Sequence, residues 1–214
     1  MKQNILQRKL KEGLISMTNS KTLEYYNNNA EYFIQGTLSV DFKQTQDKFI
    51  SFLSGKKVLD FGCGSGRDTK YFIDKGLDVV AIDGSEELCK RASNYTGINV
   101  RRMLFQELSE IDKYDGIWAC SSILHLPKSE LKPVIKKMLL ALHQNGVIYT
   151  SFKYSEFEGE RNGRYFTDFT LEGFMEYISD IHDVVVEEYW ITGDVRQGRE
   201  EEKWLNLILR KINS

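Results

Sequence analysis

The stretch "VLDFGCGSGRD", residues 58–68, decides the fold, because three glycines within five positions directly follow a run of strand-forming residues. A glycine-rich turn between a strand and a helix lets the backbone approach a ligand closely, and it directs helix N–H groups at an anion. A tight turn with no ligand is the structural alternative. The stretch therefore predicts a strand–turn–helix unit at which a nucleotide-like ligand could bind.

The spacing of these glycines argues against a dinucleotide. A dinucleotide turn follows GxGxxG or GxGxxA, whose third small residue lets the helix pack closely on its strand. Here Gly62 and Gly64 are followed by Arg67 at that third position. A carboxylate, Asp83, ends the next apolar run, "VVAID", where it can accept hydrogen bonds from ribose hydroxyls. The pattern favours a ribose-containing ligand over NAD.

Apolar runs and amphipathic stretches alternate along the rest of the chain. Strands are predicted at residues 57–61, 78–83, 98–105, 114–122 and 146–154, and helices at 67–76, 84–97, 129–145 and 170–180. Ser85 and Gly97 are expected to cap the second helix, and Ser129 and Gly146 the third. Such alternation predicts a doubly wound α/β fold with a mostly parallel sheet.

The closing strands and the opening helices complete the expected architecture. Strands 183–192 and 203–212 are joined by a polar loop too short for a crossover helix, so they should be antiparallel. Two aromatic-rich helices, 22–36 and 41–55, are expected to cover the rim at the carboxyl ends of the strands. We expect residues 1–54 to be an extension and helical cap, 55–214 to be the main domain, and the residues before Met17 to be dispensable for ligand binding.

Composition narrows the class of protein and its partners. The chain has 214 residues, is 41% apolar and 28% charged, and carries a formal net charge of −2, which argues against nucleic acid as a partner. Its three cysteines form no CxxC pair, so neither a disulfide framework nor a metal site is expected. Without a signal peptide or a long apolar run, the expected location is the cytoplasm and no membrane partner is expected.

Four ordered motifs carry a family resemblance: "VLDFGCGSGRD", "VVAIDGS", "RRMLFQEL" and "YDGIWACSSILHLP". Together they resemble the class I S-adenosylmethionine-dependent methyltransferases, particularly the small bacterial ones grouped with tellurite-resistance methyltransferases. The resemblance spans residues 25–177. It implies a seven-stranded Rossmann-like sheet with the last strand antiparallel, and S-adenosyl-L-methionine as the cofactor.

The resemblance also implies roles for individual positions. Asp60 and the backbone of the turn would face the amino-acid portion of the cofactor, Asp83 its ribose, and Glu107 its adenine amino group. Tyr26 resembles cap aromatics that approach the sulfonium, although it could equally be a packed helix residue. The cofactor-binding set is therefore Tyr26, Asp60, Gly62, Cys63, Gly64, Asp83, Glu107 and Cys120.

Catalysis and acceptor binding are predicted from the segments after the fourth and fifth strands. His125 in "SSILHLP" is the histidine placed near the rim, either as a proton acceptor or as a ring that orders the loop. Lys153, Arg161 and Arg164 in "SFKYSEFEGERNGRYF" would bind an anionic or zwitterionic small molecule, with Gly159 and Gly163 letting the segment bend as a lid. The alternative is that both arginines pair with nearby glutamates on a solvated loop.

Three functions stay open at this point. A methyltransferase acting on a small molecule is the leading hypothesis, and similar compact domains that methylate tRNA are the second. A non-catalytic module that binds S-adenosylmethionine is the third, because the turn and the acidic ribose position predict binding without proving turnover. The expected oligomeric state is a monomer or a homodimer.

Overall fold

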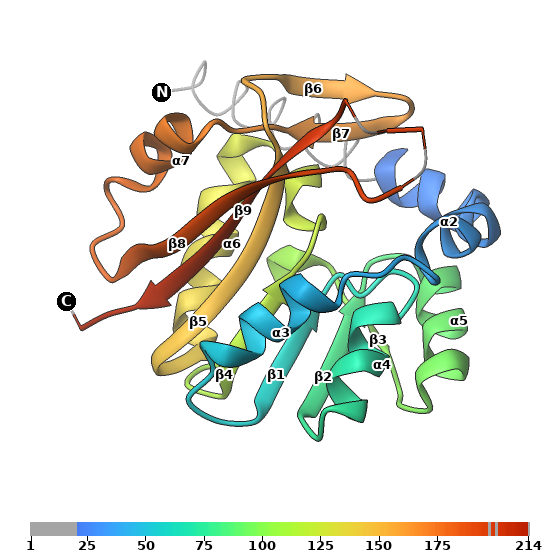
Figure 1. Cartoon of the computed structure of the whole chain (residues 1–214), viewed down its shortest axis with the longest axis horizontal. Helices are drawn as coiled ribbons and strands as arrows, with labels where there is room; N and C mark the ends of the chain where they lie inside the picture. The colour runs from blue at the N-terminus through green and yellow to red at the C-terminus, as the bar shows by residue number, and fades with distance from the viewer. Residues whose placement is uncertain (1–20, 197, 200, 214) are drawn as a thin grey trace, which may run out of the picture.

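The structure, a computed structural model, describes residues 21–196, 198–199 and 201–213 (Figure 1). The extension proposed before Met17 lies outside these residues. Seven strands form one sheet in the order β3-β2-β1-β4-β5-β9-β8. Their bounds are β1 Lys57–Phe61, β2 Asp78–Asp83, β3 Arg101–Arg102, β4 Tyr114–Ala119, β5 Leu142–Lys153, β8 Val184–Gly193 and β9 Lys203–Lys211.

The direction of the strands confirms the predicted architecture. Strands β1 to β5 pair in parallel, and β9 runs antiparallel to both β5 and β8. The fold is therefore a doubly wound, mostly parallel seven-stranded sheet whose last strand is antiparallel. The carboxyl ends of β1, β2, β4 and β5 meet at one rim, which is where ligands bind in such sheets.

Helices cover both faces of the sheet. One face packs against α3 Lys43–Ser51, α4 Arg67–Asp74 and α5 Glu86–Thr96, and the other against α6 Lys128–Ala141 and α7 Leu171–Ile178 (Figure 1). The alternation of side chains along β1 shows why both faces need cover: Val58 lies in the α3 side of the core, and Leu59 and Phe61 lie in the α6 side. The predicted boundary at residue 54 stays a prediction, although Phe49 of α3 is fully buried in that core.

The N-terminal cap is helical as expected. Residues 21–28 are helical and are followed by α2 Ala30–Thr37. The predicted caps of α5 are confirmed, because the Ser85 hydroxyl accepts a hydrogen bond from the Leu88 N–H and Gly97 adopts a left-handed conformation. Among the described residues, no helix is both long and apolar enough to cross a membrane.

The predicted bounds of one helix and one strand are wrong. Helix α6 begins after Pro127 rather than at Ser129, and it ends at Ala141 because Leu142 already pairs with Tyr114 at the start of β5. The pairing then shifts register before Val147, so Gly146 lies in an irregular part of β5 and does not end the helix. The third strand is shorter than predicted. Only residues 101–102 pair with β2, and a 3₁₀ turn, η1 Phe105–Glu107, follows.

Candidate active site

A cavity of about 640 Å³ lies at the carboxyl ends of the parallel strands. One end is lined by the glycine turn after β1 and by Asp83 at the end of β2. Residues 120–122 after β4 run from this turn to β5, because the Ser122 hydroxyl donates to the Phe61 carbonyl at 2.6 Å and the Ser121 N–H donates to the Ser151 hydroxyl at 2.9 Å. The other end is lined by β5, by a small hairpin, and by the loop between β8 and β9. The helical residues 21–28, which include Tyr26, contribute to the wall between the two ends.

The glycine turn has a shape that other residues would not adopt. Gly62, Gly64 and Gly66 have φ of 92°, 56° and 81°, which is the left-handed region. A Cβ on Gly62 would lie 2.5 Å from the Ser122 Cβ, and one on Gly64 would lie 2.9 Å from the ring of Phe33. The turn therefore packs against Ser122 and Phe33, and Gly62, Cys63 and Gly64 all line the cavity. Their predicted contact with the cofactor stays a prediction.

Asp83 is held by the same turn. Its carboxylate accepts hydrogen bonds from the Gly64 N–H at 3.0 Å and the Ser85 N–H at 2.8 Å, and it lines the cavity. Burial raises its pKa, and the backbone hydrogen bonds oppose that rise. Two oxygens offer about four acceptor sites, so this carboxylate can accept further hydrogen bonds from a ligand.

Two predicted cofactor residues are not brought into the wall of the cavity. Asp60 is buried within β1, where it accepts a hydrogen bond from the Thr69 hydroxyl at 2.5 Å, and its burial raises its pKa well above the ordinary value. The carboxylate of Glu107 instead accepts a hydrogen bond from the Leu104 N–H at 2.7 Å. Its neighbour Gln106 lines the cavity in its place. Cys120 does line the cavity.

A buried polar network around Asp68 was missed from the sequence. Its carboxylate accepts hydrogen bonds from Gln46 Nε2 at 2.7 Å, Trp118 Nε1 at 2.8 Å and Arg67 Nε at 2.7 Å. The Arg67 guanidinium also lies over the ring of Phe42, 4.8 Å from its centroid. Arg67 thus ties the start of α4 to the N-terminal helices. Arg67 is the neighbour of Asp68 in sequence, but Gln46 and Trp118 lie 22 and 50 positions away, so no local motif signals the whole network.

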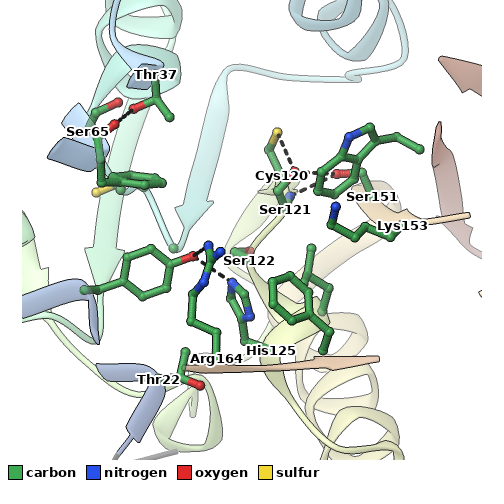
Figure 2. A pocket seen from close by; sticks show the side chains of 18 of the residues that line it. Thr22, Thr37, Ser65, Cys120, Ser121, Ser122, His125, Ser151, Lys153 and Arg164 are labelled. Atoms are coloured by element: carbon green, nitrogen blue, oxygen red, sulfur yellow. Dashed lines mark hydrogen bonds between the residues drawn. The ribbon is translucent and has the colours of Figure 1, made fainter. Parts of the chain in front are cut away.

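His125 and Tyr26 meet at the centre of the cavity. The Tyr26 hydroxyl and His125 Nε2 are 2.8 Å apart, and His125 Nδ1 lies 2.6 Å from the carbonyl oxygen of Tyr165. Burial, with a smaller contribution from the nearby Arg164, lowers the pKa of His125 to about 4, although the hydrogen bond to the Tyr165 carbonyl opposes this shift. Figure 2 shows His125 and Arg164 side by side, with Ser151 and Lys153 farther along the wall. The predicted catalytic histidine is therefore a neutral ring inside the site.

The three predicted acceptor-binding cations all line the cavity but differ in their partners. Lys153 forms an ion pair with Glu202, and Arg161 forms one with the buried Asp168. Arg164 donates a hydrogen bond to the Tyr26 hydroxyl at 3.4 Å and lies over the ring of Tyr25. Within the described part of the chain, no carboxylate pairs with Arg164. The alternative in which both arginines pair with Glu156, Glu158 or Glu160 is therefore not what the structure shows.

The segment predicted to bend as a lid is a hairpin. Strands β6 Glu158–Arg161 and β7 Arg164–Thr167 pair antiparallel, and Asn162 and Gly163 form the two-residue turn with φ of 49° and 75°. Asn-Gly between two strands is the strongest short-range signal for such a turn, so the sequence did contain it. The hairpin also contacts the N-terminal cap, because the Tyr165 N–H donates to the Thr22 hydroxyl at 3.0 Å.

The sequence of this chain is similar to those of known methyltransferases. The profile of a methyltransferase domain family matches residues 58–146, which run from β1 into β5. An uncharacterized methyltransferase of Staphylococcus carnosus is 24% identical over 156 residues, covering 68% of this chain and 75% of its own length. The chain spans less than half the length of two further curated relatives.

Residues 58–146 are a methyltransferase domain, which identifies the chain as an S-adenosylmethionine-dependent methyltransferase.

Solved structures extend the similarity of this methyltransferase to nearly the whole chain. The 1,6-didemethyltoxoflavin-N1-methyltransferase of Burkholderia thailandensis has a TM-score of 0.74 at 19% identity, covering 93% of this chain and 91% of its own. TehB of Haemophilus influenzae has a TM-score of 0.66 at 19% identity, covering 86% of this chain and 67% of its own. These likenesses confirm the methyltransferase fold. In the described residues, no cluster of three or more metal-ligating side chains is found.

Proposed function

We propose that this methyltransferase transfers a methyl group from S-adenosylmethionine to a small molecule that carries an anionic group. The observation that carries the proposal is that one cavity is lined at one end by groups that suit the cofactor and at the other by a cation that suits an anionic acceptor. A glycine turn and an acidic strand end form one part, and a cation without a carboxylate partner among the described residues, Arg164, faces the other. The neighbour from Burkholderia, which acts on the small molecule 1,6-didemethyltoxoflavin, supports an acceptor of that size.

The residues at the first end fit the cofactor. Gly62 and Gly64 line the cavity, and a Cβ on either would collide with Ser122 or Phe33, so only glycine brings the backbone this close to the ligand space. Asp83 is fixed by two backbone N–H groups with acceptor sites to spare, which suits it to hold the ribose hydroxyls. Cys63 and Cys120 complete the wall beside the amino-acid portion. The cofactor supplies an electrophilic methyl group on a sulfonium.

The protein's task is then to align the acceptor and exclude water. Arg164 presents a planar guanidinium that can bind a carboxylate or another oxyanion with two hydrogen bonds. Lys153 and Arg161 neutralise Glu202 and Asp168, so their charges are already matched within the site. An anionic group on the acceptor would therefore bind at Arg164 without breaking an ion pair.

Calorimetry tests the cofactor part of this proposal. We expect S-adenosylmethionine and S-adenosylhomocysteine to bind to the whole chain and NAD not to bind. Binding of NAD with no binding of either sulfur compound would overturn the proposal. A binding result without methyl transfer to any component of a small-molecule cell extract would favour the non-catalytic alternative.

The acceptor class is tested with radiolabelled S-adenosylmethionine. The small-molecule fraction of a bacterial extract is separated on an anion-exchange resin before the assay, and total cellular tRNA is assayed in parallel. We expect label in the retained, anionic fraction. Label confined to the unretained fraction, or to tRNA, would contradict the acceptor that we propose.

A further inference from the structure

The histidine of the site has no free nitrogen with which to touch an acceptor. Its Nδ1 lies 2.6 Å from the Tyr165 carbonyl oxygen, which can only accept a hydrogen bond, so Nδ1 carries the proton. A neutral ring then leaves Nε2 as an acceptor, and its partner at 2.8 Å is the Tyr26 hydroxyl. Tyr26 therefore donates its proton to His125 in the ground state.

The surroundings hold this pair in place. His125 is 9% exposed and its ring contacts Phe166 edge-on at 4.8 Å between centroids, while the Tyr26 ring meets Phe33 edge-on at 5.2 Å. The carbonyl that orients His125 belongs to β7, the same strand that carries Arg164. The hairpin thus fixes the tautomer of the histidine and places the cation beside the tyrosine oxygen.

The Tyr26 oxygen has a second partner besides His125. That oxygen also accepts a hydrogen bond from Arg164 Nη1 at 3.4 Å. Five charged or titratable groups act on Tyr26, each from a different element. They are Asp83 at the end of β2, Arg164 of the hairpin, the adjacent Tyr25, Arg196 of the β8–β9 loop, and His125 of η2 Ile123–His125.

We propose that Tyr26 and His125 form a proton relay, in which Tyr26 takes the proton of the acceptor's nucleophilic N–H or O–H and passes its own proton to His125. Tyr26 is the catalytic residue of the pair and His125 acts through it as a positioning residue and final proton acceptor. The inference rests on the methyl transfer proposed above. It assigns Tyr26 a chemical role that a packed or sulfonium-facing ring alone would not have.

The step balances in atoms and charge. The acceptor's lone pair forms the new bond to the methyl carbon, and the sulfur–methyl bond breaks with its electron pair going to sulfur. The acceptor's proton goes to the Tyr26 oxygen, and the Tyr26 proton goes to His125 Nε2. One positive charge therefore leaves sulfur as another forms on imidazole, so the net charge of the site does not change. The histidine later releases its proton to water.

The relay narrows the class of acceptor. A nucleophile that is already deprotonated at neutral pH would not need the relay, so the reacting atom should be an N–H nitrogen or an O–H oxygen that still carries its proton. An anionic substituent bound at Arg164 would offset the positive charge that disfavours a protonated His125. The acceptor class that we infer is therefore a small N–H or O–H compound with an anionic substituent.

The first test needs no acceptor. The chain has three histidines, so nitrogen-15 NMR of histidine-labelled protein in the presence of S-adenosylhomocysteine can be assigned with variants of the other two. We expect His125 to be protonated on Nδ1 and unprotonated on Nε2. Tyr26→Phe should move the Nε2 signal, and Tyr32→Phe, which removes an exposed hydroxyl from α2, should not. Protonation on Nε2, or an Nε2 signal indifferent to Tyr26→Phe, would overturn the relay.

The second test measures turnover with the anionic extract fraction. Tyr26→Phe keeps the aromatic ring but removes the relay oxygen, so kcat should fall roughly 100-fold or more while affinity for S-adenosylhomocysteine is unchanged. His125→Ala should show a similar loss that added imidazole partly restores. A Tyr26→Phe enzyme with full kcat would overturn the relay and leave the methyltransferase assignment intact. If the wild type bound the cofactor and methylated nothing, the proposed function and the relay's catalytic role would both fail.

The pH profile tests whether His125 stays in its proton-accepting form during turnover. Because the pKa of His125 is lowered to about 4, its proton-accepting form persists well below the ordinary value of 6.5. We expect wild-type kcat/KM to show no acid limb attributable to a histidine between about pH 8 and 5.5. An acid limb near the ordinary histidine value that disappears in His125→Ala would contradict this arrangement.

Discussion

The two ends of the cavity differ in which groups position the ligand. At the glycine-turn end, backbone groups at the ends of β1 and β2 do the positioning, and Asp83 is fixed by the N–H groups of Gly64 and Ser85. At the acceptor end, side chains from the β6–β7 hairpin and the β8–β9 loop do it through ion pairs such as Arg161 with Asp168. Tyr26 and His125 lie between the two.

This difference teaches where specificity can change. Strand ends are held by the ladder of the whole sheet, so the first end varies little without disturbing the fold. Hairpins and loops on the same rim can change their charges without such a cost, which lets one fold serve many acceptors. Substitutions at the glycine-turn end should therefore change the affinity for the cofactor, and substitutions at the acceptor end should change the KM for the acceptor.

The largest effect is expected at Asp83. Removing its carboxylate in Asp83→Ala deletes two charge-assisted contacts to the ribose, each worth about 1.5–3 kcal/mol, so cofactor affinity should fall roughly 100-fold or more. The matched control is Asp78→Ala, at the exposed start of the same strand. Titration calorimetry with S-adenosylhomocysteine measures both. Equal affinity in the two variants would contradict the assignment of Asp83 to the cofactor.

Arg164→Gln should act on the other binding constant. Losing one charged contact of about 1.5–3 kcal/mol would raise the KM for the acceptor roughly 10- to 100-fold and leave cofactor affinity unchanged. Arg102→Gln, an exposed arginine on β3, serves as the control. Steady-state kinetics with the anionic extract fraction is the measurement. A loss of cofactor affinity in Arg164→Gln would show that the two ends are not separate.

His125, which lies between the two ends, should make the free energy of unfolding depend on pH. The folded pKa of His125 is about 4 and its ordinary value is 6.5, so the unfolded chain binds the extra proton and stability is lost as the pH falls through that window. Between pH 7 and 5 this group accounts for about 2 kcal/mol. Urea unfolding at the two pH values should show that much less pH dependence in His125→Gln. An unchanged dependence would mean that the ring is not buried in its neutral form.

The smallest effect is expected at the hairpin turn. Gly163 has a φ of 75°, so Gly163→Ala should cost about 1 kcal/mol of stability and raise the acceptor KM slightly. Gly36→Ala, in helix α2 with nothing within 4 Å of the added Cβ, should stabilise the protein by a similar amount. Thermal unfolding of the pair gives opposite shifts if the turn is as described. Shifts of the same sign would contradict that turn.

What could be predicted from the sequence follows the same division. Glycine spacing, the acidic strand end and the alternation of elements are local signals. They predicted the fold, and the structure places the turn and Asp83 on the cavity wall. Glu107 does not line the cavity, because its side chain turns back to the Leu104 N–H, a contact that spacing does not reveal. The pairing of Tyr26 with His125 joins residues 99 positions apart, so only the folded chain brings them together.

A crystal structure of the whole chain with S-adenosylhomocysteine bound is the most direct test of this division. We expect the ribose hydroxyls on the carboxylate of Asp83, the amino-acid portion along the glycine turn, and the sulfur facing the side of the cavity that holds Tyr26 and Arg164. The same ligand bound at the hairpin end, with Asp83 uninvolved, would contradict the account.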